Sequence, residues 1–287
     1  MNTVQTYIGG RELVISDYDL NISFPTLVMY PTLVPSKPVS MGPYSLELAW
    51  DADIDAGEHP IVVISHGTGG THLGYRTLAA HLALNGYVVL MPEHPGDNRN
   101  NNELANAPEN LSNRPRHISL TIDALLHDPH FRSAVDTNRI AIIGHSMGGY
   151  TALAVAGGKP STQQGQVVDV IADKRVKALV LLAPATPWFQ EQDALREVIA
   201  PILMLTAEHD PHTPAWHANV VVQGLAEQTQ LTHRVIKNAG HFSFMSPFPQ
   251  AIQSPQFAPS TDPEGFDRAS FQDRLKRDVL QFLIETL

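Results

Sequence analysis

The sequence has 287 residues, among them 19 Lys and Arg, 29 Asp and Glu, 14 His and no cysteine. The formal charge of −10 argues against nucleic-acid binding, which needs a dense positive surface, and the lack of cysteine excludes disulfides, thiolate metal ligands and a cysteine nucleophile. With 43% hydrophobic and 17% charged residues, the chain has the balance of a globular protein, and a soluble enzyme is the leading expectation.

The N-terminal part of the chain, residues 1–58, predicts short β-strands. It starts without the basic and apolar segments of a signal peptide, which favours a cytoplasmic location, and no apolar run in the chain approaches the length of a membrane span. Apolar runs at 12–15, 26–30 and 45–50 are separated by prolines and glycines, as is typical of short or edge strands. We expect these strands to extend the sheet that the rest of the chain forms, so that residues 1–287 make one domain.

Five short apolar runs follow Pro60 and indicate further strands. Their apolarity is continuous and not alternating, which is typical of strands that are covered on both faces. Apolar residues at helical spacing lie between them, as at 118–125, and recur near the C-terminus at 275–283. This alternation predicts an α/β fold with a mainly parallel central sheet, helices on both faces and extra N-terminal strands. The five runs are 61–64, 87–91, 139–143, 178–182 and 202–205.

Two irregular stretches interrupt the pattern. Residues 97–116 are rich in Asn and Pro, and residues 246–265 are rich in Pro, Ser and Gln. Long loops in a compact domain are usually functional lids or surface insertions. The first stretch follows the carboxyl end of a predicted strand, where open parallel sheets bind ligands. We therefore predict a lid or insert loop, with a plain surface loop as the alternative.

The strongest motif is Gly144-His145-Ser146-Met147-Gly148, a G-x-S-x-G sequence between the apolar run 139–143 and a predicted helix. A strand, a sharp turn and a helix form the context in which this motif holds a nucleophilic serine. The serine takes up a strained backbone conformation, and the flanking glycines lack the Cβ atoms that would collide. Ser146 is therefore the predicted nucleophile.

A serine hydroxyl needs a base, and the base needs a third group to orient it. With this motif the partners are expected in the order serine, acid, histidine. Asp210 lies just past the run 202–205, and His241 follows Gly240 at the end of the next predicted strand, so both are expected at the same edge of the sheet. Glu208 is the alternative acid. Most other histidines lie in predicted helices or loops and are weaker candidates for the base.

A second glycine-rich loop, Ser65-His66-Gly67-Thr68-Gly69-Gly70, follows the run 61–64. It matches the H-G-G type of loop that supplies one backbone N–H of an oxyanion hole, while the residue after the nucleophile supplies the other. The predicted oxyanion donors are therefore the backbone N–H groups of Thr68 and Met147.

Aromatic residues near these loops are candidates for the substrate pocket. Trp188 and Phe189 follow the predicted strand that ends at Leu182, although packing in the core or in a lid explains them equally well. Phe242 comes directly after His241. We predict that Trp188, Phe189 and Phe242 contact the substrate.

Two groups of potential metal ligands lack the required spacing. The three aspartates of residues 51–55 have neither the glycine nor the closing glutamate of a calcium loop, and the three histidines of residues 209–217 match no familiar site. No metal site is predicted.

Together these segments resemble the α/β-hydrolase superfamily, and within it the bacterial dienelactone-hydrolase-like proteins related to platelet-activating-factor acetylhydrolase. The resemblance runs from about residue 60 to residue 245, in family order. It implies carboxylic-ester hydrolysis through a covalent acyl-enzyme, with a small-molecule ester as the partner and no metal or organic cofactor. The segments that carry it are 65–70, 84–89, 92–96, 114–116 (Arg-Pro-Arg), 144–151 and 240–244.

Two departures from the family limit what the resemblance implies. Dienelactone hydrolases use a cysteine nucleophile where this chain has Ser146. The acetylhydrolases place the acid after the preceding strand, where this chain has Leu182-Ala183-Pro184-Ala185 and no carboxylate, so Asp210 stays the predicted acid. The predicted function is a serine esterase. An amidase or peptidase with the same triad and a non-catalytic binding protein of this fold are the alternatives.

Overall fold

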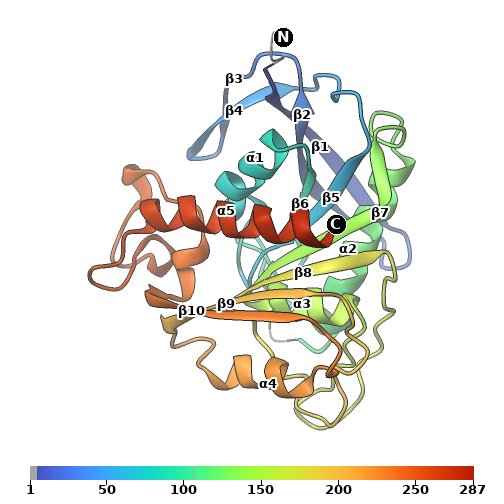
Figure 1. The fold of residues 1–287 in the computed structure, drawn as a ribbon, viewed down its shortest axis with the longest axis vertical. Coiled ribbons are helices and arrows are strands. Elements are labelled where there is room, and N and C mark those ends of the chain that lie inside the picture. Colours follow the sequence, from blue (N-terminus) through green and yellow to red (C-terminus); the bar gives the residue numbers. More distant parts are fainter. Residues whose placement is uncertain (1–4, 106) are drawn as a thin grey trace.

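Ten strands form one sheet in the computed structural model, which describes residues 5–105 and 107–287 (Figure 1). From edge to edge, the strand order is β10-β9-β8-β7-β5-β6-β2-β1-β4-β3. The strands are β1 (Tyr7–Asp17), β2 (Ile22–Thr32), β3 (Lys37–Met41), β4 (Tyr44–Trp50), β5 (His59–Ser65), β6 (Val88–Pro92), β7 (Val135–His145), β8 (Val176–Leu182), β9 (Ile202–His209) and β10 (Leu231–Gly240). The helices are α1 (Arg76–Leu84), α2 (Glu109–His127), α3 (Met147–Val155), α4 (Trp216–Gly224) and α5 (Arg268–Thr286), with 3-10 turns η1 (His72–Tyr75), η2 (His241–Phe244), η3 (Gln250–Ile252) and η4 (Ala258–Ser260).

The sheet has a parallel half and a mainly antiparallel half. Strands β5 to β10 run parallel to one another. Beyond β6, β2 pairs antiparallel with both β6 and β1, β4 pairs parallel with β1, and β3 pairs antiparallel with β4. The predicted fold class, a mainly parallel sheet with helices on both faces and extra N-terminal strands, is therefore confirmed.

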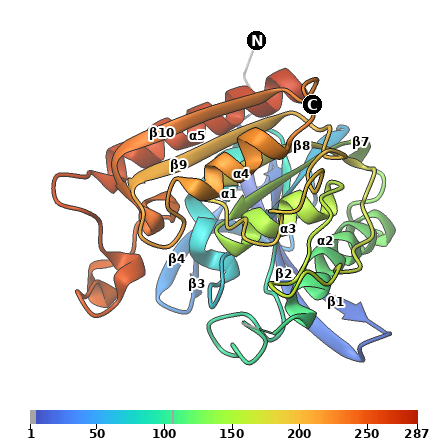
Figure 2. The ribbon, with the colours of Figure 1, turned by 90° about the horizontal axis from the view of Figure 1, so that it is seen from below.

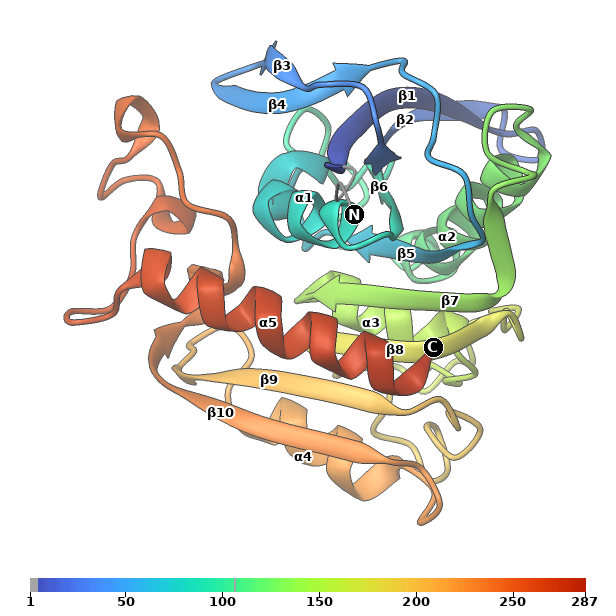
Figure 3. The same cartoon turned by 45° about the horizontal axis from the view of Figure 1, so that its top comes forward.

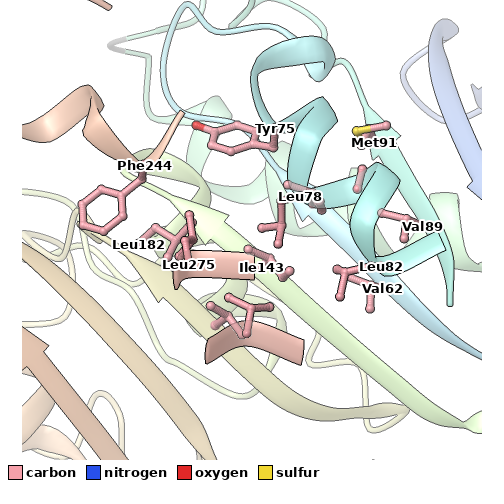
Figure 4. Packing of buried hydrophobic residues seen from close by; sticks show 14 of the residues in the cluster. Val62, Tyr75, Leu78, Leu82, Val89, Met91, Ile143, Leu182, Phe244 and Leu275 are labelled. Carbon is pink, nitrogen blue, oxygen red and sulfur yellow. The ribbon is translucent and has the colours of Figure 1, made fainter. Parts of the chain in front are cut away.

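The central strands are buried on both faces because their side chains alternate between two layers of helices. Val62 and Ile143 belong to the apolar cluster under α1 and α5, whereas Val63 and Ile142 belong to the cluster under α2, α3 and α4. Figures 2 and 3 show these two sets of helices on opposite faces of the sheet. In Figure 4, Leu78 of α1 points toward Ile143. No helix in the described part of the chain is long and apolar enough to cross a membrane.

The first irregular stretch differs from the prediction, because helix α2 begins at Glu109 and residues 109–116 are helical. In the sequence, Pro115 signals a helix break. It has no N–H to donate to the carbonyl oxygen of Leu111, one turn earlier. The hydroxyl of Tyr150 donates to that oxygen instead, at 2.8 Å. A contact from α3 therefore lets α2 continue through the proline.

Candidate active site

The three residues of the predicted triad lie just past the ends of strands, at one edge of the sheet. Ser146, Asp210 and His241 directly follow β7, β9 and β10, respectively. Because these strands are parallel, their carboxyl ends meet at the same edge. The sheet thus brings together segments that are far apart in the sequence.

The backbone at Ser146 is held in an unusual conformation. Its φ of 55° and ψ of −117° are sparsely populated by residues that have a side chain. The surrounding turn is tight, since a Cβ on Gly144 would lie 2.0 Å from the carbonyl oxygen of Gly148, and a Cβ on Gly148 would lie 1.9 Å from that of Ser65. Both glycines of the motif are therefore required by packing. Helix α3 starts at Met147, so the positive end of its dipole lies directly behind Ser146.

Asp210 and His241 form a buried pair. Nδ1 of His241 lies 2.8 Å from Oδ2 of Asp210, and the backbone N–H groups of His212 and Thr213 each donate to Oδ1 at 2.8 Å. The Thr213 hydroxyl donates to Oδ2 at 2.7 Å. Burial raises the pKa of Asp210, but hydrogen bonds from His241 and Thr213 outweigh burial and bring this pKa below its ordinary value. An ionised Asp210 holds the proton of His241 on Nδ1, so that Nε2 is the basic nitrogen of the neutral ring.

Glu208, the alternative acid, makes different contacts. Its carboxylate accepts a hydrogen bond from the backbone N–H of Asn238 at 2.8 Å and lies 3.9 Å from Nε2 of His209. The side chain of Glu208 is 41% exposed, whereas that of Asp210 is 1% exposed. The structure therefore brings Asp210, and not Glu208, against His241.

His145, directly before Ser146, connects the nucleophile turn to the His241 turn. Its Nε2 donates to the carbonyl oxygen of His241 at 2.9 Å, and the two ring centroids are 4.8 Å apart. Burial lowers the pKa of His145 to about 3, so its ring is a neutral donor. Among the described residues, the hydrogen bonds of the His241 ring involve Nδ1, and Nε2 makes none to Ser146 in this geometry.

The glycine-rich loop after β5 lies against the nucleophile turn. A Cβ on Gly67 would lie 3.1 Å from Cβ of Ser146. The Gly70 N–H donates to the Gly67 carbonyl oxygen at 3.0 Å, which closes a turn around Thr68. Thr68 and Met147 line the same cavity of about 380 Å³. The residues of the two predicted oxyanion donors thus meet at one cavity beside Ser146.

The three aromatic residues predicted to contact substrate have different positions. Trp188 is half-buried and lines the cavity of about 380 Å³. Phe189 is 2% exposed and stacks on Tyr150 with ring centroids 5.3 Å apart, so it belongs to the core and not to the cavity wall. Phe242 is half-buried beside His241, with ring centroids 5.0 Å apart. The prediction for Phe189 therefore finds no support in its position.

Sequence reasoning found only part of the cavity wall. Pro108 and Leu111 lie in the stretch 97–116, which was predicted as a lid or insert loop at the ligand-binding edge, whereas residues 162–164 enter the wall from an unpredicted small hairpin closed by a bridge between Ser161 and Val167. No motif marks residues 162–164, because only the fold brings them to the site. A pattern search in the sequence therefore had no signal to find them.

The second irregular stretch supports the His241 turn from behind. The Ser243 hydroxyl accepts from the backbone N–H of Gly240 at 3.0 Å and donates to Asp262 at 2.6 Å. Arg268, at the start of α5, binds both carboxylate oxygens of Asp262, at 2.9 and 3.0 Å. These contacts tie the stretch to α5. A lid role for either irregular stretch stays a prediction.

A larger cavity of about 630 Å³ is lined by segments 158–161, 167–170 and 191–194, by Gly165 and by none of the predicted site residues. Within residues 5–105 and 107–287, no group of three or more His, Asp or Glu side chains is arranged to hold a metal ion. The predicted oxyanion donors adjoin the smaller cavity, which is therefore the candidate substrate site.

A family model described as the alpha/beta hydrolase fold matches residues 60–200. Among curated relatives, a bis(hydroxyethyl) terephthalate hydrolase of Streptomyces coelicolor is 28% identical over 188 residues, which cover 65% of this chain and 52% of the relative. The chain spans about half the length of the first curated relatives that it matches.

Solved structures show the same fold. A ferulic acid esterase from Streptomyces cinnamoneus has a TM-score of 0.70 at 20% identity, with 100% of this chain and 91% of that chain covered. A dienelactone hydrolase-like promiscuous phosphotriesterase from metagenomic libraries has a TM-score of 0.62 at 16% identity, with 97% and 98% covered. The matching family model and the solved structures show that the chain has the α/β-hydrolase fold, with dienelactone hydrolase-like proteins among its structural neighbours, as its motifs predicted.

Proposed function

We propose that this chain is a serine esterase that cleaves small carboxylic esters through a covalent acyl-enzyme. One observation carries the proposal: the 2.8 Å hydrogen bond between the buried Asp210 and His241, whose turn is connected through His145 to the strained Ser146. Such a pair prepares a neutral imidazole to accept a proton from a nearby hydroxyl. The similarity to a relative named for ester hydrolysis supports the same reaction class.

In the first half of the reaction, the Ser146 hydroxyl attacks the ester carbonyl carbon while Nε2 of His241 takes its proton. Asp210 keeps the imidazole in the required tautomer and stabilises the imidazolium that forms. The hydrogen bond between Ser146 and His241 is expected to form when substrate binds, because catalytic hydrogen bonds are often long in free enzymes. His241 then gives the proton to the leaving alcohol, and the acyl group stays on Ser146.

The oxyanion that develops on the substrate needs donors that are already in place. We assign this role to the backbone N–H groups of Thr68 and Met147. Each donor of this kind contributes about 3–4 kcal/mol of transition-state stabilisation. In the second half of the reaction, water attacks the acyl-enzyme with His241 as base, and Ser146 leaves with the returned proton.

The candidate substrate site favours a small acyl group. Its volume of about 380 Å³ is near the lower end of small-molecule sites, and the half-buried Trp188 offers an aromatic wall. The relative named for bis(hydroxyethyl) terephthalate and the structural neighbour named for ferulic acid both act, by their names, on esters of aromatic acids. We therefore propose short-chain or aromatic acids as the acyl part of the substrate.

The test is a panel of p-nitrophenyl esters, from acetate to octanoate and including benzoate, with wild type and Ser146→Ala. The proposal expects hydrolysis by wild type, its loss in the variant, and labelling of Ser146 by a fluorophosphonate probe. Faster turnover of matching p-nitroanilides would favour the amidase alternative. A protein that neither hydrolyses the panel nor reacts with the probe would be a non-catalytic member of the fold.

A cytoplasmic location and the absence of nucleic-acid partners stay predictions from the sequence. Fractionation of cells that express the natural gene would check the first, and a binding assay with duplex DNA at low salt would check the second.

A further inference from the structure

Arg114 and Asp97 form an ion pair without solvent access beside the glycine-rich loop. Both side chains are 0% exposed, and Nη1 of Arg114 lies 2.7 Å from Oδ2 of Asp97. Asn110 donates a further hydrogen bond to Oδ2 at 2.8 Å. Moving two charges out of water costs a large desolvation free energy. Replacing a buried ion pair with apolar residues of similar size therefore often leaves the stability unchanged. Stability alone therefore does not account for this pair, and its other contacts indicate a second role.

The pair holds the glycine-rich loop on both sides of Thr68. Oδ1 of Asp97 accepts a hydrogen bond from the backbone N–H of Gly69 at 2.9 Å. Nη2 of Arg114 donates to the carbonyl oxygen of His66. Because guanidinium and carboxylate are fixed to each other, the backbone here cannot shift without breaking a charge-assisted hydrogen bond.

The same guanidinium group also reaches the helix behind the nucleophile. Nε of Arg114 donates to the Thr151 hydroxyl at 3.0 Å. That hydroxyl in turn donates to the carbonyl oxygen of Met147 at 3.0 Å. One side chain is therefore linked to the loop on either side of Thr68, directly at His66 and through Asp97 at Gly69, and through Thr151 to the backbone of Met147.

We propose that Arg114, held by Asp97, is a positioning residue that sets the spacing between the N–H groups of Thr68 and Met147. The inference rests on the proposed esterase function. An oxyanion hole works only when both donors lie within hydrogen-bond distance of the developing charge, and small displacements are costly. Arginine suits this task because its planar fork donates in several fixed directions, whereas lysine keeps the charge without the fork.

The test compares Arg114→Lys with a matched control, Arg116→Lys, two residues along the same helix. Arg116 also binds a carboxylate, that of Asp17 at 2.5 Å, but its side chain is 39% exposed. We expect R114K to lower kcat for p-nitrophenyl acetate by roughly 10- to 100-fold with little change in KM, because oxyanion hydrogen bonds strengthen in the transition state. R116K should leave kcat within about twofold of wild type, because Arg116 binds Asp17 and Asp19 at the end of β1 and not the glycine-rich loop.

Inhibition by a trifluoromethyl ketone supplies a readout that a purely structural role would not move. Ser146 adds to such a ketone, and the resulting tetrahedral adduct places its oxyanion in the hole. R114K should weaken inhibition by about the same factor by which kcat/KM falls, while its melting temperature is followed by circular dichroism. An inhibition constant equal to that of wild type in folded R114K would overturn the proposal.

If R114K does not fold, Thr151→Val tests the proposal instead. This variant removes the hydroxyl that connects Arg114 to the carbonyl oxygen of Met147 and keeps the shape of the side chain. We expect T151V to weaken inhibition roughly three- to tenfold, as a displaced donor loses part of its effect. Unchanged inhibition would overturn the proposal.

Ser146→Ala and wild type distinguish failure of the positioning role of Arg114 from failure of the proposed esterase function. Esterase activity that is lost in S146A, together with normal inhibition of folded R114K, overturns the positioning role alone. Wild-type protein without esterase activity overturns the proposed function as well.

Discussion

Asp97 and Asp210 are both buried near the same edge of the sheet but have different partners. Asp97 is paired with Arg114, which keeps its charge at every physiological pH. Asp210 is paired with His241, whose imidazole can gain and lose a proton. A carboxylate beside a permanent cation fixes geometry, whereas one beside an imidazole can stabilise a charge that arises only during a reaction. Burial and pairing therefore do not identify a catalytic carboxylate until the chemistry of its partner is considered.

Removal of the nucleophile gives the largest expected effect and sets the scale for this comparison. Ser146→Ala should lower kcat for p-nitrophenyl esters by about 10⁶-fold if serine, histidine and aspartate act as a unit. Steady-state hydrolysis by purified protein measures this loss. Near-normal turnover in the variant would remove Ser146 from the mechanism and leave Asp210 without its assigned task.

Substitution of the acid comes next in size. Asp210→Asn should lower kcat by about 10⁴-fold with a modest change in KM, because the neutral amide no longer holds the imidazole in the required tautomer. The matched control is Glu208→Gln, two residues earlier, which should retain nearly full activity because Glu208 contacts the backbone at Asn238 and not His241. A severe loss in E208Q with normal activity in D210N would exchange the two roles.

The free energy of unfolding should depend more on Asp97 than on Asp210. Asp97→Asn leaves the Arg114 charge buried without its counterion, which typically costs about 3–5 kcal/mol in the free energy of unfolding. Urea unfolding followed by circular dichroism measures this cost. D210N should lose less stability than D97N, since its partner can stay neutral. Equal losses of stability in both variants would erase the distinction between the two carboxylates.

The pH dependence of stability gives the smallest expected effect. The pKa of Asp210 in the folded protein lies below its ordinary value of 3.8, so its contribution to stability is fully present well above 3.8 and is lost progressively as the pH falls from there through the lower pKa of the folded protein. Between about pH 5 and pH 3, the melting temperature of wild type should therefore fall more steeply than that of D210N. Other carboxylates are common to both proteins. If the curves of melting temperature against pH were parallel for wild type and D210N, His241 and Thr213 would not stabilise the ionised form of Asp210.

Features encoded by neighbouring residues could be predicted from the sequence. The continuous apolar runs gave the central strands, because a strand covered on both faces has no solvent-facing positions. The strained turn at Ser146 was marked by glycines two residues away on each side, whose missing Cβ atoms the packing requires. The order of strands then placed Asp210 and His241 at the same edge.

Features that depend on distant contacts could not be predicted. Asp97 and Arg114 are 17 residues apart in a stretch interpreted as irregular, and only the fold turns their side chains toward each other. Trp188 and Phe189 are adjacent and chemically alike, yet Trp188 lines the candidate substrate site and Phe189 is buried against Tyr150. Their difference is set by the direction of each side chain, which depends on packing partners elsewhere in the chain.

Pro115 and Tyr150 carry a consequence for protein engineering. The proline releases a backbone oxygen, and a phenol from the neighbouring helix occupies it. The two positions therefore form a coupled pair: a phenylalanine at 150 strands that oxygen, while an alanine at 115 supplies a competing N–H and makes the phenol redundant. Substituting Tyr150 while Pro115 is kept therefore removes the donor to that oxygen, so the proline is best replaced before the tyrosine or together with it.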